Sequence, residues 1–425
     1  MNKALLRQQT HACPIRWASI QEETTMKLID PILGFHNELK QIRRTIHAHP
    51  ELSYEEFKTA DLVAEKLTSW GIPVIRGMGV TGVVGVIKNG TSKRAVGLRA
   101  DMDALPLQEM NSFEHKSRHE GKMHACGHDG HTTMLLGAAH YLAHHKNFDG
   151  TVYVIFQPAE EGAGGAKRMM DEGLFEQCPM EAVFGMHNWP GAPAGTMGVV
   201  SGPMMASSNE FELTIKGKGS HAAQPHLSTD PVMVAVQIAQ SWQTIISRNK
   251  NPLDAGVLSV TQIHSGSATN IVPDSASMIG TVRTFTMETL DLIEKRMGEI
   301  AQHTAEAFGA TVEFNFRRNY PPLINHEIET EFAIGVMEDV VGKDGTLKKI
   351  EPTMGSEDFA FMLLEKPGCY VFIGNGDGDH RMAGHGLGPC NLHNPSYDFN
   401  DELLPIGASY WVRLAEKFLA TPPLR

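Results

Sequence analysis

Nine consecutive residues, from Met123 to His131, contain three histidines, one cysteine and one aspartate. An apolar segment, residues 132–139, follows them directly and indicates a buried helix. A cysteine thiolate together with imidazole is the ligand set that Zn²⁺ and related transition metals prefer. If the run only capped the helix, with Asp129 as N-cap, its protonated imidazoles would repel one another at the positive helix end. The run therefore predicts a metal site, and the fold has to bring the remaining ligands to it.

Three predicted strands lead directly into polar side chains. They are residues 95–100 before Asp101 and Asp103, residues 151–156 before Glu160 and Glu161, and residues 182–186 before His187. Open α/β sheets build their sites from the carboxyl ends of such strands. The unbroken apolar run at 152–156 favours a parallel strand that is covered on both faces. We therefore expect an α/β sheet flanked by helices, with one rim carrying the site.

The remaining patterns complete this sheet and add a second unit. Apolar spacing predicts helices over 30–48 and 54–70, and Asn89-Gly90 predicts a hairpin between strands 80–88 and 94–98. Between residues 207 and 316 the order βαββαβ predicts a ferredoxin-like unit inserted into the larger domain. Its predicted strands are 211–216, 257–264, 277–285 and 311–316, and its predicted helices are 230–247 and 287–308.

A chain of 425 residues is long enough for two domains. We expect an α/β catalytic domain made of residues 26–206 and 317–425, with residues 207–316 as an inserted lid and dimerisation domain. Residues 1–25 read as a disordered extension, or as residues before a true start at Met26.

Composition narrows the class of protein. The formal net charge is −12, and no basic stripe is present that could neutralise nucleic-acid phosphates, so we expect no nucleic-acid partner. No apolar run approaches the length of a membrane span. The five cysteines are scattered without a disulfide-like pattern, which predicts a reducing compartment and hence the cytoplasm.

Five side chains are candidate metal ligands, namely Cys126, His128, Glu161, His187 and His393. One tetrahedral zinc ion takes fewer, especially if a position stays open for water and substrate. Two metal ions that share a bridging ligand would accommodate all five. Such a centre polarises a carbonyl and lowers the pKa of bound water.

The adjacent carboxylates Glu160 and Glu161 can divide the remaining work. Consecutive side chains of an extended segment point in opposite directions. We therefore expect Glu161 to face the metals and Glu160 to face the water, as general base and acid. Asp103 either accepts a hydrogen bond from a ligating imidazole or caps the next turn. His131 either supports the site in the same way or packs in the core.

Five segments together resemble motifs of the metal-dependent amidohydrolases that include hippurate hydrolase, N-acyl-amino-acid amidohydrolases and plant auxin-conjugate hydrolases. The segments are LRADMDALP at 98–106, HACGHDGH at 124–131, QPAEEG at 157–162, GMHN at 185–188 and HNP at 393–395. That family is similar to the co-catalytic zinc aminoacylases and carboxypeptidases, in which a zinc-peptidase-like domain with a mixed sheet carries an inserted, dimerising lid. The resemblance implies metal ligation by the five candidates, with Glu160 as base.

The resemblance also implies roles for three residues of the lid. His221 in GSHAAQP resembles a histidine that reaches the other subunit's site and steadies the oxyanion. Asn270 and Arg283 resemble the residues that hold the substrate's carbonyl and free carboxylate, and the planar fork of arginine suits a carboxylate. The expected assembly is a homodimer formed through the lid, or a tetramer of two such dimers.

The chain departs from the carboxypeptidase-like members at the metal site. It has Asp101-Met102-Asp103 where they have His-x-Asp, and it has Cys126 and His187 where acidic ligands are usual. This is the pattern of the hippurate-type branch. A thiolate favours Zn²⁺, whereas carboxylate and imidazole also accept Mn²⁺, Co²⁺ or Ni²⁺.

We interpret the sequence as a metal-dependent amidohydrolase that splits N-acyl or N-aroyl amino acids into a carboxylic acid and a free amino acid. Two alternatives within enzymes are a metallo-dipeptidase and a deacetylase of an N-acetyl-diaminopimelate type. A non-catalytic ligand-binding protein on the same scaffold is the alternative outside enzymes. Such a protein would have no need of Glu160.

Overall fold

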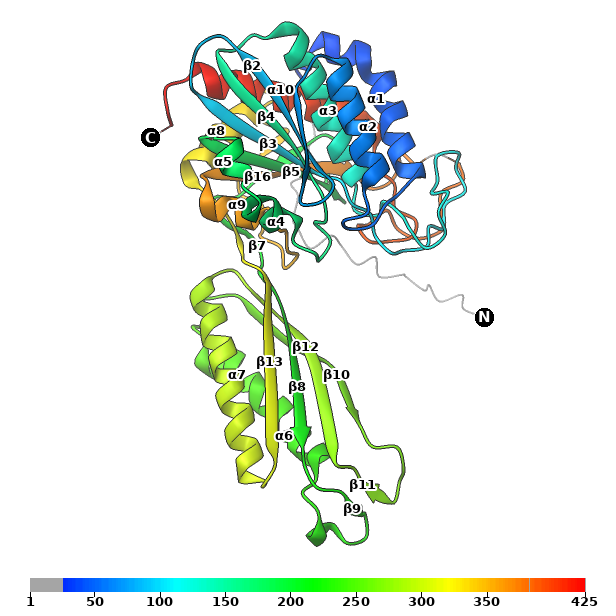
Figure 1. Cartoon of the computed structure of the whole chain (residues 1–425), viewed down its shortest axis with the longest axis vertical. Coiled ribbons are helices and arrows are strands. Elements are labelled where there is room, and N and C mark those ends of the chain that lie inside the picture. The colour runs from blue at the N-terminus through cyan, green and yellow to red at the C-terminus, as the bar shows by residue number, and fades with distance from the viewer. Residues whose placement is uncertain (1–25, 382, 425) are drawn as a thin grey trace, which may run out of the picture.

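The computed structural model describes residues 26–381 and 383–424. The expected extension at residues 1–25 lies outside the described residues. Figure 1 shows a larger body of helices and strands joined to a smaller, elongated body. Within the described part of the chain, no helix combines the length and the apolar character needed to cross a membrane.

The larger body is built on an eight-stranded sheet with the order β1-β2-β4-β3-β5-β16-β6-β15. Its strands are β1 Val74–Met78, β2 Gly82–Asn89, β3 Ala95–Asp101, β4 Gly150–Gln157, β5 Ala182–Pro190, β6 Met197–Gly198, β15 Thr346–Leu347 and β16 Gly368–Gly376. Parallel pairing joins β4 to β3, β3 to β5 and β5 to β16. Strand β2 is antiparallel to both of its neighbours, β1 and β4. The predicted mixed sheet is therefore confirmed.

Helices cover both faces of this sheet. One face packs against α1 Asp30–Ala48, α2 Phe57–Ser69, α3 His128–His145, α8 Glu327–Val341 and α10 Leu404–Ala420. The other face packs against α4 Gly165–Asp171, α5 Leu174–Gln177 and α9 Ala360–Glu365. Along β4, Val152, Val154 and Phe156 enter the first core. Tyr153 and Ile155 enter the second, so β4 is covered on both faces as expected.

The predicted hairpin between β2 and β3 is wrong, because β4 lies between these two strands in the sheet. Parallel pairing with β4 and β5 occupies both edges of β3. The Asn89-Gly90 turn is instead tied to the connection between α3 and β4. Asn89 Nδ2 donates to the carbonyl of Phe148 over 2.6 Å, and the Asp149 carboxylate accepts from the amide of Thr91 over 2.7 Å.

The smaller body has the predicted βαββαβ order. It consists of β8 Ser208–Lys216, α6 Pro231–Thr244, β10 Gly256–Ser265, β12 Ser275–Thr284, α7 Met287–Ala307 and β13 Thr311–Tyr320. The sheet order is β10-β12-β8-β13, and every pair in it is antiparallel. The helices α6 and α7 share one apolar core with this sheet. A short pair, β9 Ser220–His221 and β11 Ile271–Val272, lies at the end farthest from the larger body (Figure 1).

The two bodies meet beside another short pair, β7 Gly202–Met205 and β14 Leu323–Asn325. Strand β13 runs on to Tyr320 and so passes the expected limit at residue 316. The exact division of the chain into domains stays a prediction.

Candidate metal centre

The polar residues that follow β3 and β4, and those inside β5, meet at one rim of the large sheet. The strand expected to end at His187 runs on to Pro190, so His187 lies inside β5. The first turn of α3 and the loop that carries His393 close the same rim. A cleft of about 500 Å³ opens there between the two bodies and is lined by Cys126, Glu160, Glu161, His187 and His393, among others.

A first group of three predicted ligands converges at the start of α3. Potential ligand atoms of Cys126, His128 and His187 all lie within 4.8 Å of one another. Gly127 between the first two adopts a φ of 95°, and a Cβ there would lie 2.2 Å from Asn188 Nδ2. Only glycine fits this turn without displacing its neighbours, and the turn brings Cys126 and His128 into the same group.

A second group consists of Cys126, Glu161 and His393, whose potential ligand atoms also lie within 4.8 Å of one another. The loop that carries His393 is fixed by a hydrogen bond from the amide of His393 to the carbonyl of Ala125, over 2.8 Å. All five predicted ligands are therefore brought together. Cys126 belongs to both groups, which is the position that a ligand shared by two ions would take.

The donor atoms fit bound cations. Among the described residues, buried His128 Nε2 and Glu161 Oε1 have no hydrogen-bond partner, although Glu161 Oε1 lies 3.2 Å from His393 Nε2. Burial opposes a charge on His128, but Asp101 and Asp103 outweigh it and raise its pKa to about 10. The site thus favours positive charge. Burial also raises the pKa of the Cys126 thiol, and a cation would reverse that effect.

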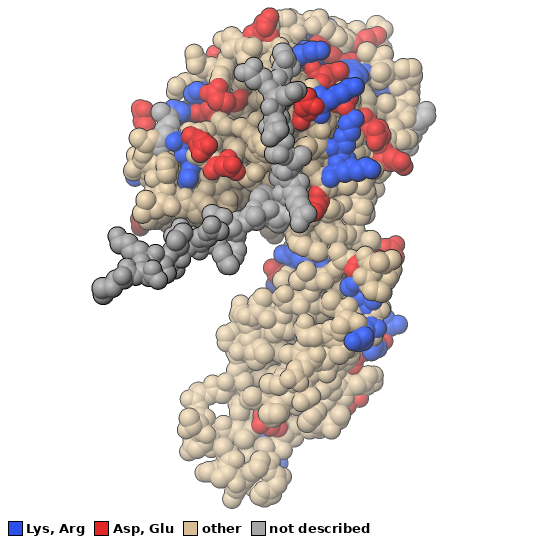
Figure 2. Space-filling view, turned by 180° about the vertical axis from the view of Figure 1, so that it is seen from behind, with Lys and Arg blue, Asp and Glu red and all other residues tan. Residues whose placement is uncertain are grey.

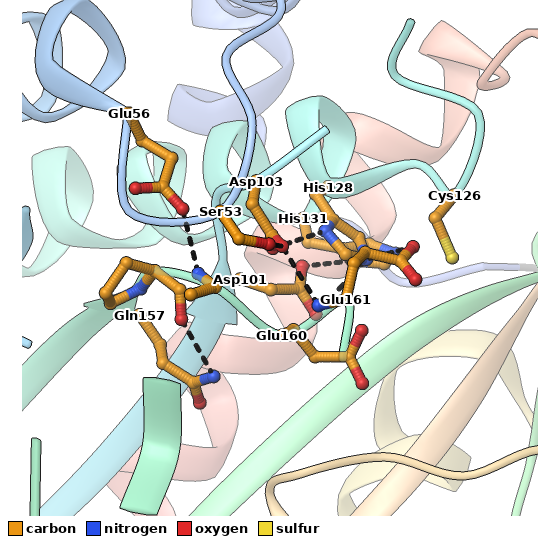
Figure 3. Close-up of polar contacts among 12 residues, drawn as sticks. Ser53, Glu56, Asp101, Asp103, Cys126, His128, His131, Gln157, Glu160 and Glu161 are labelled. Carbon is orange, nitrogen blue, oxygen red and sulfur yellow. Dashed lines mark hydrogen bonds and ion pairs between the residues drawn. The ribbon is translucent and has the colours of Figure 1, made fainter. Parts of the chain in front are cut away.

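Neighbouring groups orient these ligands. Asp103 Oδ1 lies 3.2 Å from His128 Nδ1, the contact that one of our two expectations for Asp103 required. Asp103 Oδ2 accepts hydrogen bonds from Ser53 Oγ and from the Glu161 amide, each over 2.9 Å (Figure 3). His187 Nδ1 donates to the carbonyl of Asn188 over 2.6 Å. This leaves His187 Nε2 3.3 Å from Cys126 Sγ.

Asp101 forms a further support together with His131, for which the sequence had left a supporting role and core packing open. His131 Nδ1 donates to Asp101 Oδ1 over 2.7 Å, and His131 Nε2 accepts from the Asn188 amide over 2.9 Å. The rings of His131 and His187 have centroids 4.5 Å apart. His131 therefore supports the site rather than packing in an apolar core.

The Glu160 and Glu161 carboxylates point in different directions (Figure 3), although one oxygen of each lies within 4.8 Å of the other and of a His128 ring nitrogen. One carboxylate oxygen each of Glu160, Glu357 and Asp358 lie within 4.8 Å of one another, and all three residues are buried. Arg99 donates to Glu357 over 2.8 Å and to Asp358 over 3.1 Å. Burial, followed by the charge of Glu357, raises the pKa of Glu160 well above its ordinary value. A carboxylate that binds a proton this readily suits general base catalysis.

The sequence analysis missed the Glu357-Asp358 pair. The signal was an acidic doublet like that at 160–161, but no apolar strand leads into it, so nothing in the pattern directed it to the site.

The three predicted lid residues lie in two places. Arg283 lines the same cleft as Glu160 and Cys126. No ion pair joins Arg283 to a carboxylate of residues 26–381 or 383–424, although its Nη1 donates to Thr281 Oγ1 and to the carbonyls of Val282 and Asn209. His221 and Asn270 instead line a separate pocket at β9 and β11. One chain therefore does not bring these two residues into its own cleft.

One family model and two relatives match most of this chain. The family model for peptidase family M20/M25/M40 matches residues 97–417. Hippurate hydrolase of Campylobacter jejuni is 42% identical over 93% of this chain and 100% of its own length. IAA-amino acid hydrolase ILR1-like 4 of Arabidopsis thaliana is 41% identical over 89% of this chain and 85% of its own.

One solved structure is similar to this chain over nearly its whole length. A dinuclear metal-binding peptidase of the M20 family from Bacillus subtilis has a TM-score of 0.78 and 34% identity, and the match covers 92% of this chain and 100% of that one. In this chain, the two groups of donor atoms that share Cys126 would provide one site for each of two ions.

Proposed function

We propose that hippurate-like N-aroyl amino acids are the preferred substrates of this chain. The chain belongs to peptidase family M20/M25/M40 and is a metal-dependent amidohydrolase of N-acyl amino acids. The observation that carries this proposal is the convergence of five donors around Cys126, with Glu160 beside them and Arg283 in the same cleft. The products are a carboxylic acid and a free amino acid. The hippurate hydrolase and IAA-amino acid hydrolase relatives support this substrate class.

Two divalent ions held by Cys126, His128, Glu161, His187 and His393 would polarise the amide carbonyl and make a nearby water more acidic. Glu160 is placed to accept the proton of that water and to deliver it to the leaving nitrogen. We propose Zn²⁺ as the native metal because of the thiolate, with Mn²⁺, Co²⁺ and Ni²⁺ as alternatives.

Arg283 supplies specificity in this proposal. Arg283 lines the cleft without a carboxylate partner among the described residues, and its Nη1 donates to Thr281 Oγ1 and to the carbonyl of Val282. A planar guanidinium can bind both oxygens of a carboxylate. Substrates that lack the free α-carboxylate should therefore bind poorly.

We also propose that the active assembly is a homodimer formed through the smaller body, with pairing of two dimers as an extension. The location of His221 and Asn270, away from the cleft of their own chain, supports a role in a partner's cleft. Figure 2 shows one face of the smaller body with few charged side chains. Such depletion is typical of the centre of an interface.

The cytoplasm remains the proposed compartment. Cys126, Cys178, Cys369 and Cys390 are all buried free thiols, as expected for a reducing environment.

A substrate panel on the metal-loaded enzyme tests the proposed function. The panel contains benzoyl-, acetyl- and indoleacetyl-amino acids, a benzoyl amino acid methyl ester, a dipeptide and N-acetyl-diaminopimelate. We expect hydrolysis of the N-acyl amino acids, with the benzoyl substrates fastest and the ester at least about ten-fold slower in kcat/KM. A preference for the dipeptide or for N-acetyl-diaminopimelate would contradict the proposal in favour of the corresponding alternative.

A further inference from the structure

The loop between α1 and α2 rests against the carboxyl end of β3. The amide of Ala104 donates to the carbonyl of Glu51 over 2.8 Å, and Leu52 forms a parallel bridge with Ala104. Ser53 Oγ from the same loop donates to Asp103 Oδ2. This docking carries Glu56 into the interior, where its exposed fraction is 0%, whereas the preceding Glu55 stays exposed.

The carboxylate of Glu56 holds two unusual turns together. Its Oε1 accepts from the amide of Ala159 over 2.8 Å and from the amide of Tyr54 over 3.0 Å. Its Oε2 accepts from Thr81 Oγ1 over 2.6 Å. Tyr54 and Ala159 have φ values of 66° and 55°, the left-handed region that residues with side chains rarely adopt. Such conformations persist where surrounding contacts impose them.

Ala159 matters because it immediately precedes Glu160 and Glu161, so its backbone conformation sets the direction of both side chains. Other bonds hold the segment after it. The carbonyl of Glu160 accepts from Tyr320 Oη over 2.6 Å, and the amide of Glu161 donates to Asp103. The amide of Ala159 itself is buried and is bound by Glu56.

We propose that Glu56 is a positioning residue for the reaction: by holding Ala159 in its left-handed conformation, it aims Glu160 at the water and Glu161 at the metal ligands. This inference rests on the proposed function. Glu56 touches neither the cleft nor the ligands, so its effect on catalysis passes through the turn.

The chemistry of the contacts predicts which substitutions preserve this role. Glu56 acts as an acceptor toward two amides, and the amide oxygen of glutamine can replace Oε1. The Thr81 hydroxyl can then accept a hydrogen bond from the new NH₂ group. Glu56→Gln should therefore keep the turn. Glu56→Asp keeps the charge but is one methylene shorter, and Glu56→Ala lacks the acceptor.

Glu51→Ala is the matched control from the same loop. The Glu51 carboxylate accepts from the amides of Lys58 and Thr59 over 2.9 and 3.0 Å, and so caps the start of α2. It has no hydrogen bond to the turn at Ala159. Its loss should therefore lower the melting temperature without altering the turn.

The experiment compares these variants in the metal-loaded enzyme by kcat, KM and bound metal, and in metal-free protein by hydrogen exchange of a peptide spanning residues 157–165. A misplacement of about 1 Å can cost about 100-fold in rate. We therefore expect Glu56→Ala and Glu56→Asp to lower kcat by about 10- to 100-fold with KM within about three-fold. Exchange in the 157–165 peptide should be at least about ten-fold faster in both.

Glu56→Gln and Glu51→Ala should keep kcat within about three-fold of wild type and leave that peptide's exchange unchanged. The inference is overturned if Glu56→Asp keeps wild-type kcat and exchange, or if Glu56→Gln loses as much as Glu56→Asp. The comparison of Glu56→Asp with Glu56→Gln tests the positioning role even if Glu56→Ala fails to fold. An inactive wild type would refute the proposed function, and the hydrogen-exchange comparison would still test the role of Glu56 in the turn.

Discussion

Glu160→Gln should separate catalysis from metal binding and from stability. Glu160 has an oxygen within 4.8 Å of Glu357 and Asp358, and one within 4.8 Å of His128 and Glu161, whereas only Glu161 also joins the group of Cys126 and His393. The substitution would therefore remove the proposed base and keep the five proposed ligands. General acid and base catalysis contributes about 10²- to 10⁴-fold, so kcat should fall at least about 100-fold while bound metal stays at the wild-type level.

The same substitution should stabilise the metal-free protein. Within 4.8 Å and at an effective dielectric constant of about 20, two ionised carboxylates repel each other by about 3 kcal/mol or more. Arg99 already offsets part of the charge of Glu357 and Asp358, so we expect a gain of about 1–3 kcal/mol at pH 8.

The sign of the pH dependence follows from the raised pKa of Glu160, which has burial as its first cause and Glu357 as its second. The folded protein binds this proton more tightly than the unfolded chain does. The ionised carboxylate therefore destabilises the fold above its ordinary pKa of 4.5, and the advantage of the variant should shrink as the pH falls toward that value.

Urea unfolding of chelator-treated protein at pH 5 and pH 8 measures the stability, and release of glycine from hippurate measures kcat. Glu161→Gln is the control, since it should lose metal and activity together. A Glu160→Gln variant that keeps more than about a tenth of wild-type kcat, or that loses metal, would refute the division of roles between the two carboxylates.

Three further predictions concern the ligands, the assembly and a buried histidine. Cys126→Ser should lower metal content and activity in parallel, as measured by elemental analysis and hippurate turnover. Co-refolding His221→Ala with Glu160→Ala chains in equal amounts should restore about one quarter of wild-type activity, because about half of the dimers are mixed and each of these holds one intact cleft. Burial disfavours a charge on His47, but Asp129 outweighs it and raises its pKa to about 10. Its ordinary value is 6.5, so this stabilisation is complete below that pH and is lost as the pH rises toward 10. The melting temperature of wild type should therefore fall more steeply across this range than that of His47→Gln.

Sequence patterns predicted most of the proposed ligands because these lie where local information is strong. Cys126 and His128 stand in a dense cluster, and Glu161 follows a long apolar strand. The carboxyl ends of neighbouring parallel strands meet, which explains why Glu161 lies near the rim, whereas the position of the His393 loop depends on a contact with Ala125 that no local pattern indicates. The βαββαβ order of the smaller body was predictable for the same reason, since each of its strands and helices has a clear period.

Other features depend on which strands become neighbours. The turn signal at Asn89-Gly90 was real, but parallel pairing of β3 on both edges overrode it. Arg99 is a charge inside an otherwise apolar strand, and its partners Glu357 and Asp358 are known only once the fold brings them together. No local pattern indicates such pairings.

Local sequence patterns also do not predict the role of a residue that acts through another subunit or through another residue. The sequence around His221 resembles a functional segment, yet the structure places it far from its own cleft. The role of Glu56 likewise depends on Ala159, whose left-handed conformation has no signal in an alanine.

The central claim is that five donors hold two catalytic ions around Cys126. Removing all metal with a chelator and adding back Zn²⁺ in steps, with bound metal and hippurate hydrolysis measured at each step, tests it most directly. We expect no activity in the stripped protein, binding of about two ions per chain, and full recovery only when both sites fill. Full activity without metal, or with at most one ion per chain, would contradict the account.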